Sequence, residues 1–257
     1  MKKTKIITVA NHKGGVGKTT TVASVSSLLA HAGLKVLMID LDPQCSLTES
    51  FVNDEPDLTI YDAFLNPRTD WNKAVITVRD NLDLMPSSVL VSDLDMMLAA
   101  KTQNEKYLLK ILKNMAADER YDVIMLDCSP SLGLITVNAL VAADEVFVPT
   151  MAEVMPLRGL KKIEMKIEEI AEELNPGLRI SGIIVTRYNS SKNLNRSVLE
   201  ALEKNYSDVI FKTAIRENVK LAETPQFRKD IVEYAPESNG AKDYVSLVQE
   251  IIDRIED

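Results

Sequence analysis

A glycine-rich segment near the start of the chain constrains the fold more than any other feature. Residues 11–20 read Asn-His-Lys-Gly-Gly-Val-Gly-Lys-Thr-Thr, between an apolar strand expected over Lys5–Ala10 and a helix expected over Lys18–Ala32. Glycines let a backbone wrap closely around a phosphate, and the amides at a helix start point at the anion with the help of the helix dipole. The segment therefore predicts a phosphate-binding loop. A glycine-rich turn without a ligand is the alternative, and the number of specified positions between a strand and a helix argues against it.

Several side chains of this loop have an expected role. Lys18 reaches the β- and γ-phosphate oxygens, and the Thr19 hydroxyl binds Mg²⁺. The loop departs from the general GxxxxGK[ST] pattern because His12 stands where the first glycine belongs, and it matches KGGxGK[ST] with an additional Lys13 at its start. The residues expected to bind the nucleotide phosphates are Lys13, Gly14, Gly15, Val16, Gly17, Lys18, Thr19 and Thr20.

Short apolar runs alternate with helical patterns along the chain. The expected strands are Lys5–Ala10, Lys35–Asp40, Asn81–Met85, Tyr121–Asp127, Glu145–Pro149 and Ile180–Thr186. The expected helices are Lys18–Ala32, Ser87–Ala117, Leu134–Ala142, Leu157–Leu174, Leu194–Asn205 and Ala241–Ile255, with a short helical piece around Thr59–Leu65. Strands that are apolar on both faces are typical of a parallel sheet covered by helices. The alternation predicts a doubly wound α/β fold, a mostly parallel sheet with helices on both faces, as a single domain over residues 1–257 without an N-terminal helix-turn-helix extension.

Three aspartates stand at strand ends, where a parallel sheet places its ligands. Asp40 ends the second expected strand and Asp42 follows two positions later, so both side chains face the same side. One of the two is expected to hold metal-bound water and the other to orient the attacking water. Asp127 ends the strand that begins at Tyr121 and is expected to coordinate Mg²⁺ through water. Each acid alone is compatible with a solvated turn, but their order after the phosphate loop favours a magnesium-dependent nucleotide site.

Charge and termini exclude several classes of protein. The 257 residues carry 30 Lys and Arg against 38 Asp and Glu, a net charge of −8, which excludes a protein that coats nucleic acid with its whole surface but leaves room for a local basic patch. The first apolar run covers only Ile6–Ala10, too short for a secretory signal of about 7–15 apolar residues, and no run approaches the roughly 20 of a membrane span. Cys45 and Cys128 lie far apart without CxxC spacing, which disfavours a disulfide and a zinc site. We expect a cytoplasmic protein.

The phosphate loop is one of five segments that form a recognisable set. They are residues 13–20, 40–44 (Asp-Leu-Asp-Pro-Gln), 127–133 (Asp-Cys-Ser-Pro-Ser-Leu-Gly), 157–160 (Leu-Arg-Gly-Leu) and 218–223 (Asn-Val-Lys-Leu-Ala-Glu). With this set the chain resembles, over nearly its whole length, the ParA/MinD family of deviant Walker ATPases, and more closely its ParA (Soj-like) partition branch. The resemblance implies ATP and Mg²⁺ as cofactors and slow hydrolysis until a partner stimulates it.

The resemblance also implies a homodimer that sandwiches the nucleotides. Lys13 is then the lysine that reaches across the dimer to the partner's phosphates, where a cation supplied in trans stabilises transition-state charge. Asp42 positions the water, Lys18 contacts the phosphates, and the metal-site residues are Thr19, Asp40 and Asp127. Base contacts are expected from Thr186, Arg187, Ile215, Arg216 and Asn218. Soj-like members commonly carry Pro-Arg in this last loop, where this chain has Arg216-Glu217.

The choice between DNA and membrane rests on charge. Membrane-bound relatives end in a basic amphipathic helix, whereas residues 245–257 carry one Arg against four acids, so anionic lipid would repel them. We expect that helix to pack on the sheet, with no membrane partner. Non-specific, salt-dependent DNA binding needs a basic cluster, and its candidates are Arg187, Lys192, Arg196, Lys220, Arg228 and Lys229.

The resulting hypothesis is a nucleoid-associated ATPase switch for plasmid or chromosome partition. ATP closes a dimer on DNA, and a ParB-like centromere-binding activator, whose basic arm the acidic chain attracts, stimulates hydrolysis and release. The alternatives are the same switch positioning a protein organelle or chemotaxis cluster, a membrane-bound MinD-like regulator, and an iron–sulfur relative with Cys45 and Cys128 as ligands. A tyrosine autokinase is disfavoured because the C-terminus lacks a tyrosine cluster.

Overall fold

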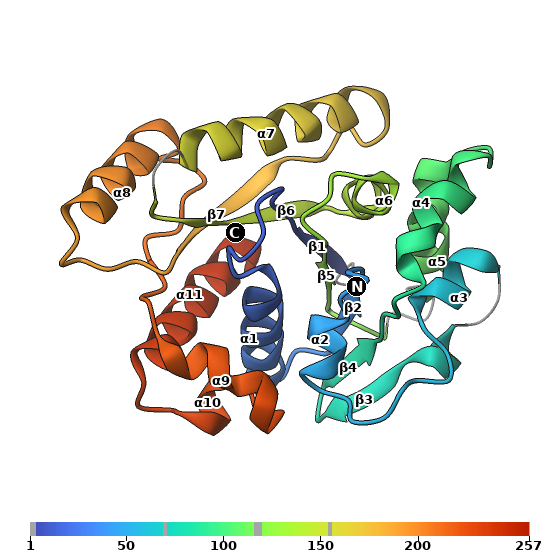
Figure 1. Ribbon diagram of the computed structural model, residues 1–257, viewed down its shortest axis with the longest axis horizontal. Helices are drawn as coiled ribbons and strands as arrows, with labels where there is room; N and C mark the ends of the chain where they lie inside the picture. Colours follow the sequence, from blue (N-terminus) through green and yellow to red (C-terminus); the bar gives the residue numbers. More distant parts are fainter. Residues whose placement is uncertain (1–3, 69–70, 116–119, 154–155, 257) are drawn as a thin grey trace.

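A seven-stranded sheet forms the centre of the computed structural model, which describes residues 4–68, 71–115, 120–153 and 156–256 (Figure 1). The strands are β1 Lys5–Val9, β2 Val36–Asp40, β3 Ile76–Arg79, β4 Leu82–Met85, β5 Val123–Asp127, β6 Glu145–Met151 and β7 Ile180–Thr186. Their order is β3-β4-β2-β5-β1-β6-β7, and every pair is parallel except β3 with β4. The carboxyl ends of β1, β2 and β5 therefore meet at one edge of the sheet.

Helices cover both faces of this sheet (Figure 1). One face carries α3 Ile60–Leu65, α4 Val91–Ala99, α5 Tyr107–Met115, α6 Leu134–Ala142, α7 Pro156–Glu173 and α8 Asn193–Asn205. The other face carries α1 Lys18–His31, α2 Ser46–Glu49, α10 Ile231–Tyr234 and α11 Asn239–Glu256. Successive residues of the central strands alternate between two buried apolar clusters: Leu37 and Ile39 face the first, Val36 and Met38 the second. Helix α9, Val219–Phe227, lies beside α10 and buries no residue. The doubly wound fold that the sequence predicts is confirmed.

Some elements differ from the sequence prediction. The single helix expected over Ser87–Ala117 is wrong in the described part: it divides into α4 and α5, with Gln103 at a left-handed φ of 51° between them. Each half turns its own apolar side to the core, so one continuous rod is not needed to bury both. Residues 116 and 117 of that prediction lie outside the described residues. Strand β3 was missed because its side chains are only partly buried at the sheet edge, α2 and α10 because they have four residues each, and α9 because it buries no residue and contains Pro225.

The last helix, α11, lies on one face of the sheet, as expected, and packs beside α1. Tyr244, Leu247 and Ile251 on its apolar side are at most 1% exposed. Among the described residues no helix is long and apolar enough to cross a membrane. Cys45 and Cys128 are free thiols in the structure.

Candidate functional site

The glycine-rich loop connects β1 to α1 at the carboxyl edge of the sheet. Gly15 and Gly17 have φ values of 73° and 89°, a region that residues with a Cβ rarely adopt, and Gly17 directly precedes α1 as its N-cap residue. No side chain caps that helix start, and its first turn contains no acid. Asn11 anchors the loop by accepting a hydrogen bond from the Lys13 amide (3.0 Å) and donating one to the Pro149 carbonyl (2.7 Å). The first amides of α1 thus remain available for an anion.

Lys18, the first residue of α1, is buried beside this loop. Only 7% of the residue is exposed, and its Nζ lies 3.4 Å from the Lys13 carbonyl oxygen. Burial lowers the pKa of Lys18, and the nearby negative charges of Asp127 and Asp42 oppose that shift. A buried ammonium without a strong partner is well placed to bind phosphate oxygens.

Asp127, at the end of β5, is fully buried, and neither of its carboxylate oxygens has a hydrogen-bond partner among the residues that the structure describes. Burial, followed by the neighbouring charge of Asp40, raises the pKa of Asp127 well above its usual range, while Thr19 and Lys18 favour the charged form. An orphaned buried carboxylate is costly unless a cation or proton joins it. Its oxygens, together with the Thr19 hydroxyl, fit the hard oxygen ligands that Mg²⁺ prefers.

Asp40 pairs with Asp127 across the β2–β5 ladder but already has protein partners. One oxygen accepts from the Asp42 amide (3.0 Å), and the other accepts from the Thr48 amide and hydroxyl (2.9 and 2.8 Å). Burial raises the pKa of Asp40 to about 6, against the effect of these bonds. Asp40 therefore anchors the loop after β2 in addition to lying near the predicted metal position.

Asp42 is more accessible than Asp40 and is half-buried. Its Oδ1 accepts from the Gln44 amide (2.9 Å), and its backbone carbonyl accepts from the Ser87 hydroxyl (2.9 Å). Its charge acts on both Lys18 and Asp127. A carboxylate in this position, near the buried charges and open to solvent, has access to a water molecule.

Lys13 lies apart from these groups. Its Nζ pairs with Glu153 at 2.9 Å, and both side chains are about half exposed, at 50% and 52%. Within the single chain Lys13 therefore points along the surface and not into its own phosphate site.

A cavity of about 370 Å³ adjoins the phosphate loop. The predicted base-contact residues Thr186, Arg187, Ile215, Arg216 and Asn218 all line it, with Gly15 and Gly17 at its phosphate end. Glu217, inside the expected range 215–218, lines the cavity as well, and sequence reasoning missed the further lining residues Val219, Leu221, Ala222 and Tyr244. Residues 218–223 form one of the five sequence segments of the resemblance, whereas Tyr244 gives no signal beyond the apolar period of its helix.

Two contacts fix the walls of this cavity. The Thr186 hydroxyl donates to the Val16 carbonyl at 2.9 Å and so ties β7 to the phosphate loop. The carboxylate of Asp243 on α11 accepts from the Arg216 amide at 2.9 Å and pairs with the guanidinium at 2.6 Å. The segment at residues 215–218 is thereby held against α11.

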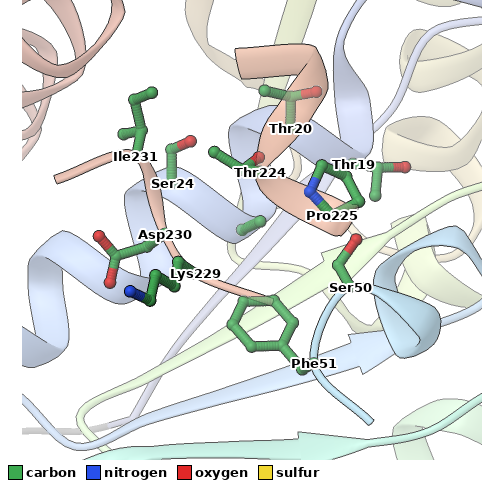
Figure 2. Close-up of a pocket in the computed structure, with 11 residues that line it drawn as sticks. Thr19, Thr20, Ser24, Ser50, Phe51, Thr224, Pro225, Lys229, Asp230 and Ile231 are labelled. Atoms are coloured by element: carbon green, nitrogen blue, oxygen red, sulfur yellow. The ribbon is translucent and has the colours of Figure 1, made fainter. Parts of the chain in front are cut away.

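A smaller hollow of about 40 Å³ lies elsewhere along α1 (Figure 2). Thr19, Thr20 and Ser24 of α1 line it together with Thr224 of α9 and Lys229. This places Lys229, a predicted DNA contact, on a wall formed by α1, α9 and the start of α10, and Arg228 directly precedes it at the end of α9.

The predicted DNA-binding cations are only partly brought together. Arg187 and Lys192 share one partner, Glu217, each at 3.4 Å. Arg196 on α8 bonds to Asn193 and to the Ser190 carbonyl. Lys220 on α9 pairs with Glu223 at 2.8 Å. Arg187 and Lys192 form a close pair, while the other cations are distributed along α8, α9 and its end.

Known proteins are similar to this chain over most of its length. A family model described as an AAA domain matches residues 4–180. Chromosome partitioning protein ParA of Caulobacter vibrioides is 34% identical over 255 residues, covering 98% of this chain and 96% of that protein. Chromosome-partitioning ATPase Soj of Thermus thermophilus is 36% identical over 256 residues, covering 99% and 98%.

A solved structure extends the comparison to a bound nucleotide. Cobyrinic acid a,c-diamide synthase from Mycobacterium smegmatis, crystallised with an ATP analogue and magnesium, matches with a TM-score of 0.85 at 29% identity, covering 98% of this chain and 96% of that one. The fold, the phosphate loop and these near-full-length similarities agree with one another. The chain therefore belongs to the ParA/Soj family of P-loop partition ATPases.

Proposed function

We propose that this protein is an ATP- and Mg²⁺-dependent switch that holds DNA in its ATP-bound dimer and releases it after hydrolysis, in plasmid or chromosome partition. The observation that carries the proposal is the set of buried, unneutralised charges at one sheet edge. Lys18 and the orphaned oxygens of Asp127 lie beside a helix start with free amides. A phosphate chain with its metal ion supplies the charges that this set lacks.

In the proposed reaction, each group keeps the position that the fold gives it. Lys18 binds the β- and γ-phosphate oxygens, and the hydroxyl of Thr19 and carboxylate of Asp127 hold the metal ion, which neutralises phosphate charge when bound. Asp42 orients the attacking water through its solvent-accessible carboxylate. The base occupies the cavity beside Thr186 and Tyr244.

Lys13 supports the dimer part of the proposal. It is half exposed and forms an exposed ion pair with Glu153, an interaction worth about 0–1 kcal/mol. We propose that Lys13 leaves Glu153 and binds the phosphates of a second copy, which couples dimer formation to ATP. A centromere-binding activator with a basic arm then stimulates hydrolysis, drawn by the net charge of −8.

A DNA-binding titration in the presence of ATP, of ADP and without nucleotide tests the switch on wild type and on Asp42→Ala. The wild type should bind a non-specific duplex only with ATP. Asp42→Ala should keep ATP-dependent binding while hydrolysing ATP about 100-fold more slowly, because the water loses its orienting carboxylate. Asp54→Ala, the same charge change at an exposed residue of the α2–α3 connection, is the control and should behave as wild type. Normal turnover in Asp42→Ala would remove Asp42 from the mechanism, and DNA binding that ignores the nucleotide would contradict the switch.

A further inference from the structure

Glu217 lies between two cations on the surface next to the base cavity. Its Oε1 is 3.4 Å from Nη2 of Arg187, and its Oε2 is 3.4 Å from Nζ of Lys192. The three side chains are 43%, 58% and 55% exposed, respectively, so all of them are accessible to a ligand. Both cations lower the pKa of Glu217, so the carboxylate stays charged.

Backbone contacts hold these groups together, independently of the ion pairs. The Tyr188 amide donates to the Ile215 carbonyl, and the Glu217 amide donates to the Tyr188 carbonyl, both at 3.0 Å. These bonds form a short parallel bridge between Tyr188 and Arg216. The chain directly after β7, which carries Arg187, and the segment at residues 215–217, which carries Glu217, are therefore fixed side by side.

We propose that Arg187 and Lys192 form a subsite for one DNA backbone phosphate, and that Glu217 occupies the phosphate position as an internal competitor. The proposal rests on the proposed function, since it assigns one contact of the DNA-bound state. Two carboxylate oxygens facing a guanidinium and an ammonium match the way in which phosphate oxygens meet the same donors.

The competition is electrostatic and weak enough to be reversible. Exposed ion pairs contribute little to stability, so Glu217 gives up its partners readily. A DNA phosphate gains more from the same cations because its binding releases condensed counterions. The carboxylate nevertheless remains beside the bound phosphate and repels it, which sets the DNA affinity below the value that the two cations alone would give.

The subsite also adjoins the nucleotide, because Arg187 and Glu217 line the base cavity. The phosphate that these cations receive has two possible sources, the DNA backbone and the nucleotide itself. Separate titrations of DNA at saturating ATP and of a fluorescent ATP analogue without DNA distinguish them.

The test is Glu217→Gln, which removes the charge and keeps the shape, measured by fluorescence anisotropy with a labelled non-specific duplex at several salt concentrations. The variant should bind DNA about three- to tenfold more tightly at low salt, with a log–log salt slope steeper by about one to two units. Glu237→Gln is the matched control, since Glu237 pairs with Lys242 at 3.0 Å outside the subsite, and it should bind DNA as wild type does. In an Arg187→Gln/Lys192→Gln background, Glu217→Gln should no longer strengthen binding.

Each other outcome has a defined meaning. If Glu237→Gln gains as much DNA affinity, or if Glu217→Gln still gains affinity without the two cations, net charge alone explains the effect. Either result would overturn the subsite. Tighter ATP binding with unchanged DNA affinity at saturating ATP would assign the cations to the nucleotide and overturn it as well. If the wild type binds no DNA with ATP, with ADP or without nucleotide, the proposed function is contradicted. In that case the subsite stands if Glu217→Gln gains DNA binding and fails if it does not.

Discussion

The charged side chains at the two ends of the nucleotide-binding region differ in burial and in pairing. At the phosphate end, Lys18, Asp40 and Asp127 are at most 7% exposed, and the described part of the chain offers the Asp127 carboxylate oxygens no hydrogen-bond partner. At the base end, Arg187 and Lys192 are more than half exposed, and each already has a partner in Glu217. One end holds its titratable groups in the interior, and the other presents ion-paired groups to solvent.

This difference teaches which interactions the fold itself imposes. A buried charge without a partner is tolerated only because backbone strands and a helix start hold it in place, so it is tied to the ligand that completes it. An exposed pair is rearranged at little cost and can exchange one partner for another. The phosphate end is therefore expected to control whether chemistry occurs, and the base end to control how strongly a second macromolecule is held.

The largest effect should come from the buried cation. Lys18→Ala removes the ammonium that faces the phosphates, and we expect at least about a 100-fold loss in the rate of ATP hydrolysis, as for other groups that stabilise transition-state charge. A steady-state phosphate-release assay at saturating Mg²⁺–ATP measures it.

Lys5→Ala provides the comparison on the same strand–helix unit. Lys5 begins β1 and pairs with Glu145 at 2.7 Å, at the opposite end of the strand from the phosphate loop. It should hydrolyse ATP at the wild-type rate. If Lys18→Ala kept more than about a tenth of the wild-type rate, the buried ammonium would not be the main phosphate ligand.

The second effect concerns pH and the stability of the nucleotide-free protein. Burial raises the pKa of Asp40 to about 6 and that of Asp127 well above its usual range, whereas both are near 3.9 in the unfolded chain. The folded state therefore binds protons that the unfolded state has released. The stability that these groups contribute is complete below about pH 4 and is lost as pH rises through the folded pKa values.

The variant Asp127→Asn isolates the contribution of Asp127 to this pH dependence of stability. Without Mg²⁺ and nucleotide, its Tm should exceed that of wild type, and the gap should widen by about 2–4 °C between pH 5 and 8, for a difference of about 1 kcal/mol. Differential scanning fluorimetry in EDTA measures this. The same variant should lose Mg²⁺-dependent stabilisation by ATP. A gap that narrows with rising pH would show that Asp127 is not desolvated in the free protein.

The same contrast explains how much the sequence could predict. Lys18, Asp42 and Asp127 were found because each follows an apolar strand or a glycine turn, and parallel strands bring such positions to one edge without any knowledge of packing. The mostly parallel sheet and the helices on both of its faces follow from the same local periodicity, whereas the order of the strands does not. Local patterns were enough wherever the backbone alone places the side chain.

Features that depend on long-range contacts were not predictable. The bonds from Thr48 to Asp40 require knowledge of how the loop after β2 folds back, and the pairing of Glu217 with Arg187 and Lys192 joins segments about 25–30 positions apart. Tyr244 lines the base cavity from α11, far along the chain from the phosphate loop. Surface cations gave the weakest signal, since a lysine or arginine on a helix has the same pattern whether it binds DNA or only water.

Replacing any one of these cations should therefore change the DNA affinity least, so several of them must be replaced together for the change to be measurable. Lys192→Ala/Arg196→Ala/Lys220→Ala should weaken binding of ATP-bound protein to plasmid DNA at least about tenfold at low salt. The salt slope should fall by about 0.9 for each DNA phosphate that the variant no longer neutralises. An electrophoretic mobility or anisotropy titration at several salt concentrations gives both numbers.

A second triple variant serves as a control for the change in net charge. Lys161 and Lys166 on α7 and Lys242 on α11 pair with local acids, as Lys220 does, but lie outside the predicted DNA cluster. Their replacement by Ala removes the same three charges and should change the DNA affinity by less than about twofold, the effect of an altered overall field. Equal losses in the two variants would mean that no local cluster exists. Undiminished plasmid binding by the first variant would place the DNA surface elsewhere, most directly at Arg228 and Lys229 beside α10. The exposed cations that hold DNA would then lie next to α1 and α9 and not at the base end.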